Sequence, residues 1–190
     1  MLHGIGRWIW AVVAVVALTV ASPLVQAEPV GGPFVLTGPD GRTIADTDFR
    51  GQWMLIYFGY ASCPDACPTD LQRMADVLEA LGPLARRVQP IFITLDPKRD
   101  RPEVLTEHVK MFHPRLIGLS GSEAQIDEVA RRYHVRFVRN APDSGGFYTL
   151  DHSTNTYLMA PTGRFVEWYK AVLPVKVMAE AIQRWISKQR

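Results

Sequence analysis

The chain has 190 residues, of which 47% are hydrophobic and 21% are charged, and its formal net charge is +2. This length and composition are typical of one globular domain and exclude a disordered or fibrous protein. A nearly neutral balance of charge also gives no indication of a nucleic-acid-binding surface. A domain of this size buries enough surface to fold without disulfides, so its two cysteines are explained by chemistry or by chance and not by the needs of a small core.

The N-terminal segment, residues 1–27, has the composition of an export signal. A short basic start precedes the apolar run Trp8–Val20, and the small-residue pattern that ends at Ala27 predicts cleavage there. The alternative is an uncleaved membrane anchor, since residues 8–25 reach the lower limit of length for crossing a bilayer. Both interpretations place the folded domain, residues 28–190, in the periplasm or attached to a membrane and facing the periplasm.

The first strand and helix of this domain surround the two cysteines. A continuous apolar run predicts a buried strand over residues 53–58, and residues 59–67 have the composition of a loop. A helix is predicted over residues 69–81, with Thr69 and Gln72 at capping-box spacing.

The remaining elements alternate between strand and helix patterns. We expect a strand at 88–95, a helix at 102–111, a strand at 117–119, a helix at 122–133 with a capping box at Ser122 and Gln125, a brief strand at 135–138, a polar stretch at 139–151, a β-hairpin with strands at 157–160 and 165–169, and a helix from Pro174. This order predicts an α/β fold of the thioredoxin-like type, with a central mixed sheet flanked by helices. The cysteine loop would then lie at the carboxyl edge of the sheet, where α/β proteins place their chemistry.

Cys63 and Cys67 are the only cysteines, and each precedes a proline. Because proline disfavours the helical conformation of the preceding residue, we expect neither cysteine inside a helix and Cys67 beside the helix cap. In that position the helix dipole would lower the pKa of the Cys67 thiol. Two thiols at this spacing could hold a soft metal ion such as Cu(I) or Zn, exchange disulfides with a partner, or form an inert buried pair. The spacing alone leaves these alternatives open.

His152 is the candidate for a third ligand. It follows the polar stretch at 139–151 and precedes the predicted hairpin, whereas His108, His113 and His134 lie near the ends of predicted helices. The adjacent Asp151 could orient its imidazole. The Gly and Pro content of residues 139–151 suggests that this third ligand is carried on a mobile loop.

Three other residues could contribute to such a site. Tyr60 could cover the metal or a partner surface, and Asp65 could tune the charge of the loop or cap the following helix. Asp96, at the end of the second predicted strand, could approach the cysteine loop.

Residues 48–71 resemble the Sco/SenC family of copper-binding proteins, whose signature is a CPxxCP motif after a buried strand. The segment LDPKRD at 95–100 is similar to the DPxRD segment of that family, and residues 151–163 are similar to its DH…YLxxPxG segment. The resemblance covers about residues 33–188. It implies a thioredoxin-like fold and one copper, as Cu(I) or Cu(II), bound by Cys63, Cys67 and His152.

The same resemblance implies a role and partners. The protein would be a copper chaperone that assists assembly of the dinuclear copper site of cytochrome c oxidase. We expect a monomer that acts as a copper carrier, and thiol–disulfide oxidoreductase activity stays open as its enzymatic alternative. Its partners would be the copper-accepting subunit of that oxidase and a thiol reductant protein.

Two other functions remain as alternatives. A thiol–disulfide oxidoreductase would use Cys63 and Cys67 as its redox-active pair, although the usual motif is C-x-x-C and needs no distant histidine. Residues 67–70 also resemble a peroxiredoxin segment, which suggests a thiol peroxidase. Pro64 stands where those enzymes usually carry a hydroxyl side chain, which argues against peroxide reduction.

Overall fold

The computed structural model describes residues 28–64 and 66–188. The predicted export signal or anchor and Asp65 lie outside these residues. Within the described part of the chain, no helix has both the length and the apolar character needed to cross a bilayer.

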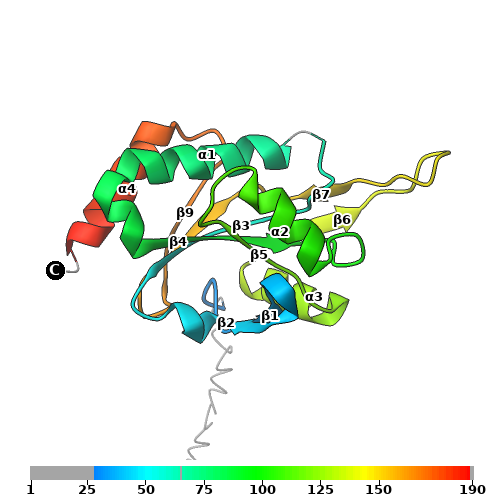
Figure 1. Cartoon of the computed structure of the whole chain (residues 1–190), viewed down its shortest axis with the longest axis horizontal. Helices are drawn as coiled ribbons and strands as arrows, with labels where there is room; N and C mark the ends of the chain where they lie inside the picture. Colours follow the sequence, from blue (N-terminus) through cyan, green and yellow to red (C-terminus); the bar gives the residue numbers. More distant parts are fainter. Residues whose placement is uncertain (1–27, 65, 189–190) are drawn as a thin grey trace, which may run out of the picture.

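A five-stranded mixed sheet with the order β5-β4-β3-β8-β9 forms the centre of the domain (Figure 1). Its strands are β3 (Trp53–Gly59), β4 (Val88–Thr94), β5 (Ile117–Leu119), β8 (Thr156–Met159) and β9 (Phe165–Tyr169). Strand β3 pairs in parallel with β4 and antiparallel with β8. Every residue of β3 is buried, as its unbroken apolar run predicts for a central strand covered on both faces.

Helices cover the sheet from both sides. They are α1 (Ala66–Leu81), α2 (Pro102–Lys110), α3 (Glu123–Arg132) and α4 (Val175–Lys188), with short 3-10 helices η1 (Pro39–Gly41), η2 (Asp46–Phe49) and η3 (Gly82–Arg87). In Figure 1, α1 and α4 lie together over one face of the sheet, and α3 lies on the opposite side. This layered arrangement confirms the predicted thioredoxin-like α/β sandwich with a mixed sheet and a hairpin, β8–β9.

Two small antiparallel sheets flank the central one. The first joins β1 (Val35–Thr37) to β2 (Thr43–Ala45), and the second joins β6 (Phe137–Arg139) to β7 (Leu150–His152). The β6–β7 hairpin and its long tip project from the body of the domain (Figure 1, yellow). The sequence predicts a single strand near β6 and no partner for it, because three-residue strands carry too little alternation to be recognised.

The start of α1 differs from the prediction. The helix begins at Ala66 instead of Thr69, so Cys67 lies inside its first turn, and Thr69 is a helical residue with no place at the cap. Pro68 is tolerated because the first N–H groups of a helix have no intrahelical acceptor. The Cys63 sulfur accepts a hydrogen bond from the Cys67 backbone N–H at 3.5 Å, which supports this earlier start. The predicted capping box of α3 is confirmed, with Ser122 and Gln125 bonded to each other.

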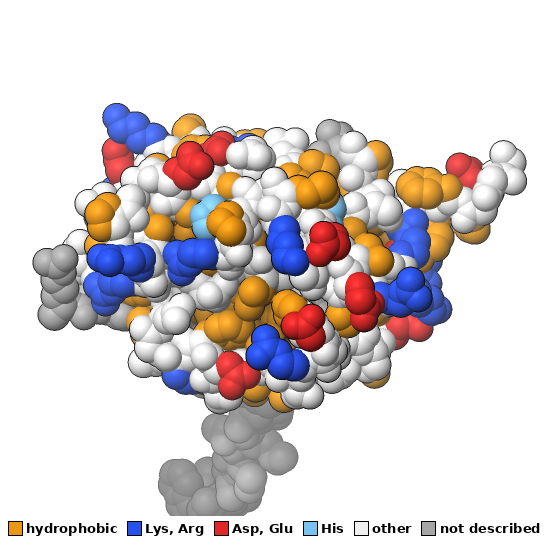
Figure 2. Space-filling view, in the orientation of Figure 1, with side chains coloured by type: hydrophobic (Ala, Val, Ile, Leu, Met, Phe, Trp, Pro, Cys, Tyr) orange, Lys and Arg blue, Asp and Glu red, His pale blue; other side chains and the backbone are white. Residues whose placement is uncertain are grey.

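The surface carries charges of both signs. On the face drawn in Figure 2, Lys and Arg side chains are interspersed with Asp and Glu, and the blue groups do not merge into a continuous basic surface there. This distribution agrees with the small net charge of +2.

Candidate metal centre

Cys63, Cys67 and His152 lie together at one end of the domain, although His152 is far from the cysteines in sequence. One side-chain ligand atom from each of the three lies within 4.8 Å of the others. The Cys67 sulfur and His152 Nε2 are 3.4 Å apart. Neither cysteine forms a disulfide. The cluster therefore lies where three elements meet: the carboxyl end of β3, the first turn of α1 and the end of β7.

Cys67 is fully buried behind the carboxyl end of β3. The absence of a side chain at Gly59 makes room for its sulfur, since a Cβ atom at that position would lie 2.8 Å from Cys67 Sγ. The Tyr57 hydroxyl lies 3.9 Å from the same sulfur and donates a hydrogen bond to Asp70 at 2.9 Å. Burial raises the pKa of Asp70, and the bond from Tyr57 opposes that shift. Tyr57 thus has a polar role at the site beyond the core packing that its sequence context predicts.

The predicted lowering of the Cys67 pKa is wrong. The hydrogen bond with the Cys63 thiol and burial both raise the pKa of Cys67. These effects outweigh the helix dipole, because the sulfur is surrounded by protein and has a second thiol as its neighbour. Because a metal binds the thiolate, this raised pKa opposes metal binding, which has to displace the proton of the Cys67 thiol.

Cys63 lies on the outer side of the pair. It is partly buried and, with Tyr60 and His152, lines a pocket of about 350 Å³. The buried Cys67 is not among the residues that line this pocket. Access from solvent therefore reaches Cys63 and His152 first. Tyr60 is itself buried and its ring stands edge-on to the His152 ring, so it forms a wall of the site.

The imidazole of His152 is oriented by the backbone and not by Asp151. Nδ1 lies 3.0 Å from the carbonyl oxygen of Ser153, which can accept only a proton carried on Nδ1. In the neutral ring, this tautomer leaves the lone pair on Nε2, which faces Cys67, as a metal ligand requires. Asp151 is exposed, and its carboxylate accepts a hydrogen bond from Asn140 at 3.2 Å. Adjacent residues of a strand point to opposite faces, which explains why the predicted pairing is wrong.

The cysteine loop is held by Asp100, a residue that the sequence interpretation missed. Its buried carboxylate accepts hydrogen bonds from the Ala61 backbone N–H at 2.8 Å and from the Thr94 hydroxyl at 2.7 Å. Asp96, predicted to approach this loop, instead contacts Tyr148 of the β6–β7 hairpin. The sequence alone could not show which of Asp96 and Asp100 contacts the cysteine loop, because both follow the same predicted strand.

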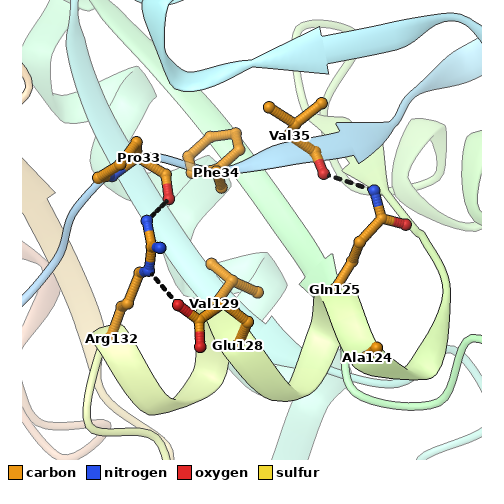
Figure 3. Close-up of a pocket in the computed structure, with 8 residues that line it drawn as sticks. All are labelled: Pro33, Phe34, Val35, Ala124, Gln125, Glu128, Val129 and Arg132. Carbon is orange, nitrogen blue, oxygen red and sulfur yellow. Dashed lines mark hydrogen bonds and ion pairs between the residues drawn. The ribbon is translucent and has the colours of Figure 1, made fainter.

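The other described histidines stay outside the cluster. His108 packs against Phe92 and Phe112, and His134 is exposed. A second cavity of about 390 Å³ lies between β1 and α3, where none of the three clustered residues reaches (Figure 3). Arg132 and Gln125 bridge its walls by donating hydrogen bonds to the backbone carbonyls of Pro33 and Val35, respectively.

Two thiols and one imidazole form a compact donor set for a soft metal ion. Thiolate sulfur favours Cu(I) or Zn, and imidazole binds copper in both common oxidation states. Three ligands leave the coordination sphere open to a further donor.

Comparison with known proteins identifies the family. The family model described as SCO1/SenC matches residues 23–187. The chain belongs to the SCO1/SenC family. The mitochondrial SCO2 homolog of Bos taurus, a SCO1/SenC relative, is 39% identical over 167 residues, which are 87% of this chain and 63% of the bovine protein. The SCO2-like protein of Rickettsia prowazekii is 41% identical over 152 residues, 80% of this chain and 74% of that protein.

Solved structures of SCO1/SenC relatives share the fold. Bradyrhizobium japonicum ScoI with copper bound is 40% identical, with a TM-score of 0.75 over 82% of this chain and 98% of that one. Arabidopsis thaliana ScoI with copper bound is 36% identical, with a TM-score of 0.79 over 84% of this chain and 99% of that one. Both similarities extend over nearly the whole of the solved chain, so the described domain corresponds to the copper-binding domain of those proteins.

Proposed function

We propose that the protein is an extracytoplasmic copper chaperone that binds one copper ion through Cys63, Cys67 and His152. The observation that carries this proposal is the convergence of three soft ligand atoms within 4.8 Å of one another. Family membership and the copper-bound relatives support copper as the metal.

The arrangement suits a carrier that must bind its metal and then release it. Cys67 is buried, whereas Cys63 and His152 line an open pocket through which a partner's ligands can reach the metal. We propose the copper-accepting subunit of cytochrome c oxidase as this partner, on the basis of the family resemblance. Residues 1–27 would export the domain to the periplasm or anchor it in the membrane.

A copper titration tests the ligand set. The reduced domain is titrated with Cu(I) and with Cu(II), and the wild type is compared with Cys63→Ala, Cys67→Ala and His152→Ala. We expect a one-to-one complex in the wild type and a severe loss of affinity in all three variants. His134→Asn is the matched control, because it removes an exposed imidazole and because Asn tolerates the positive φ of 55° at that position. Unchanged affinity in His152→Ala would contradict the proposal.

A second candidate function is thiol–disulfide exchange with a client. The specific observation in its favour is the asymmetry of the pair, in which Cys63 faces a pocket and Cys67 is buried beside it. A client disulfide would accept two electrons and two protons from the two thiols, which would join as a disulfide, and a thiol reductant protein would restore them. Peroxide reduction is disfavoured, because Cys67 does not line the pocket.

Exchange with a peptide disulfide tests this candidate. A peptide that contains an oxidised cysteine pair is mixed with the reduced protein, and free peptide thiols are counted over time. We expect reduction of the peptide by the wild type and none by Cys63→Ser. Failure of the wild type to reduce such peptides would leave copper carriage as the function.

A further inference from the structure

The strand that carries His152 is not part of the central sheet. Within the described residues, β7 pairs with β6 through three residue pairs and has no partner among the five central strands. Cys63 and Cys67 belong to the body of the domain, because Cys63 lies between β3 and α1 and Cys67 lies in the first turn of α1. The distance between the imidazole and the two sulfurs therefore depends on how the β6–β7 hairpin is attached to that body.

A buried carboxylate provides this attachment. Asp96 follows β4 and has no exposed surface. It accepts hydrogen bonds from the Arg99 guanidinium and, at 2.9 Å, from the hydroxyl of Tyr148, and it forms an ion pair with Arg139 at 3.8 Å. Tyr148 and Arg139 belong to the β6–β7 hairpin and its connection. Asp96 thus links the body of the domain to the segment that leads into His152.

Arg99 also attaches the hairpin to the body of the domain, through Tyr148. It donates a hydrogen bond to the backbone carbonyl of Tyr148 at 2.8 Å, and its guanidinium carbon lies 3.7 Å from the centre of the Tyr148 ring. The same guanidinium lies 5.6 Å from the centre of the Tyr60 ring, and that ring is edge-on to His152 with 6.0 Å between ring centres. Two sets of contacts therefore connect Arg99 to His152. One is its hydrogen bond to the hairpin backbone at Tyr148, and the other is its position over the Tyr60 ring, which lies edge-on to His152.

The segment Thr94–Asp100 also contacts the loop that carries the cysteines. Asp100 fixes the cysteine loop at Ala61, and Asp96 with Arg99 fixes the hairpin. Both anchors arise within one short connection after β4. This geometry gives the connection a role in setting the position of the imidazole relative to the two sulfurs, in addition to its contribution to stability.

We propose that Asp96 and Arg99 are positioning residues that hold His152 at bonding distance from copper by clamping Tyr148 of the hairpin to the body of the domain. This inference rests on the proposed copper site. It assigns no direct contact with copper to either residue, and their effect on affinity passes through His152.

A double-mutant cycle tests this dependence. Cu(I) affinity is measured by competition with a chromophoric Cu(I) chelator for the wild type, Arg99→Gln, His152→Ala and the double variant. Partners that orient a metal ligand typically change metal affinity by about 10-fold to 100-fold when they are lost. We expect Arg99→Gln to weaken copper binding by about this factor when His152 is present and by less than about twofold in the His152→Ala background.

Two further variants separate positioning from general damage. Tyr148→Phe removes only the hydroxyl that bonds Asp96, and we expect it to weaken copper binding in the same direction by a smaller factor. Arg50→Gln is the matched control, because it also leaves a buried carboxylate, that of Asp46, without its arginine, but at the opposite end of β3. We expect Arg50→Gln to lower the melting temperature without changing copper affinity.

The copper-free protein offers an independent readout. We expect Arg99→Gln to increase amide hydrogen exchange at residues 150–152 and to leave exchange in β3 unchanged. Equal losses of affinity with and without His152, or wild-type affinity and exchange in folded Arg99→Gln, would overturn the clamp. An unchanged affinity in His152→Ala alone would instead refute the proposed ligand set, and the inference would fall with it.

Discussion

Replacement of Gly59 by alanine would test how tightly the protein is built around the Cys67 sulfur. The added Cβ would lie 2.8 Å from Cys67 Sγ and 3.0 Å from ring carbons of both Phe92 and Tyr57. Favourable contacts between such atoms occur at about 3.5 to 4.0 Å, so the neighbours would have to move apart by up to about 1 Å. All three neighbours are fully buried, which leaves the sulfur few directions in which to move.

The expected cost is that of overpacking a core. Insertion of an extra methyl group into a well-packed interior costs about 1 to 3 kcal/mol. For a domain of this size that corresponds to a decrease in melting temperature of about 2 to 12 °C, measured by calorimetry of the copper-free protein. Because the displaced atom is a proposed copper ligand, we also expect Cu(I) affinity to fall by at least about tenfold.

Gly118→Ala provides the matched control. Its Cβ would lie 2.9 Å from the Cβ of Leu105, in an equally tight place in β5 but away from the cysteines. We expect a similar loss of stability in Gly118→Ala with unchanged copper affinity. Equal copper affinity in the two alanine variants, or a Gly59→Ala protein as stable as the wild type, would refute this account of the Cys67 environment.

Three further predictions concern the surroundings of the site. Tyr57→Phe removes a hydrogen bond from the buried Asp70, and we expect urea denaturation to show a loss of about 1 to 3 kcal/mol; an unchanged midpoint would contradict that role. Burial lowers the pKa of His108 below 6.5, so the unfolded state binds its proton more tightly, and the free energy of unfolding should fall as the pH drops through 6.5. His108→Phe should show a smaller fall over the same range, and an equal fall would exclude this residue as the cause. Saturation with Cu(I) at a free concentration 100 times the dissociation constant should add about 2.7 kcal/mol to the unfolding free energy in the wild type, and a chelator should remove this gain.

The strands and helices that form the core were largely predictable from the sequence. The apolar run of β3 and the amphipathic pattern of α3, with its cap at Ser122, each carry a strong local signal. The start of α1 was not predictable in the same way, because proline disfavours the helical conformation of the residue before it, and Pro68 follows Cys67. The hydrogen bond from the Cys67 backbone N–H to the Cys63 sulfur supports the earlier start of the helix.

The three proposed ligands could be named from the sequence, but their surroundings could not. The spacing of Cys63 and Cys67 indicated the loop, and the position of His152 after the polar stretch, together with the family resemblance, indicated the third ligand. The partners of these residues come from long-range contacts that no spacing encodes, such as Asp100 with Ala61 and Gly59 with the Cys67 sulfur. The pKa of Cys67 was mispredicted for the same reason, because its burial depends on packing from several elements.

The most direct test of the central claim is X-ray absorption spectroscopy of the Cu(I)-loaded protein, performed on the wild type and on His152→Ala. Our account predicts one copper per chain, coordinated by two sulfur atoms and one imidazole nitrogen, with the nitrogen signal lost in His152→Ala. A wild-type spectrum without an imidazole contribution, or an unchanged spectrum in His152→Ala, would contradict it.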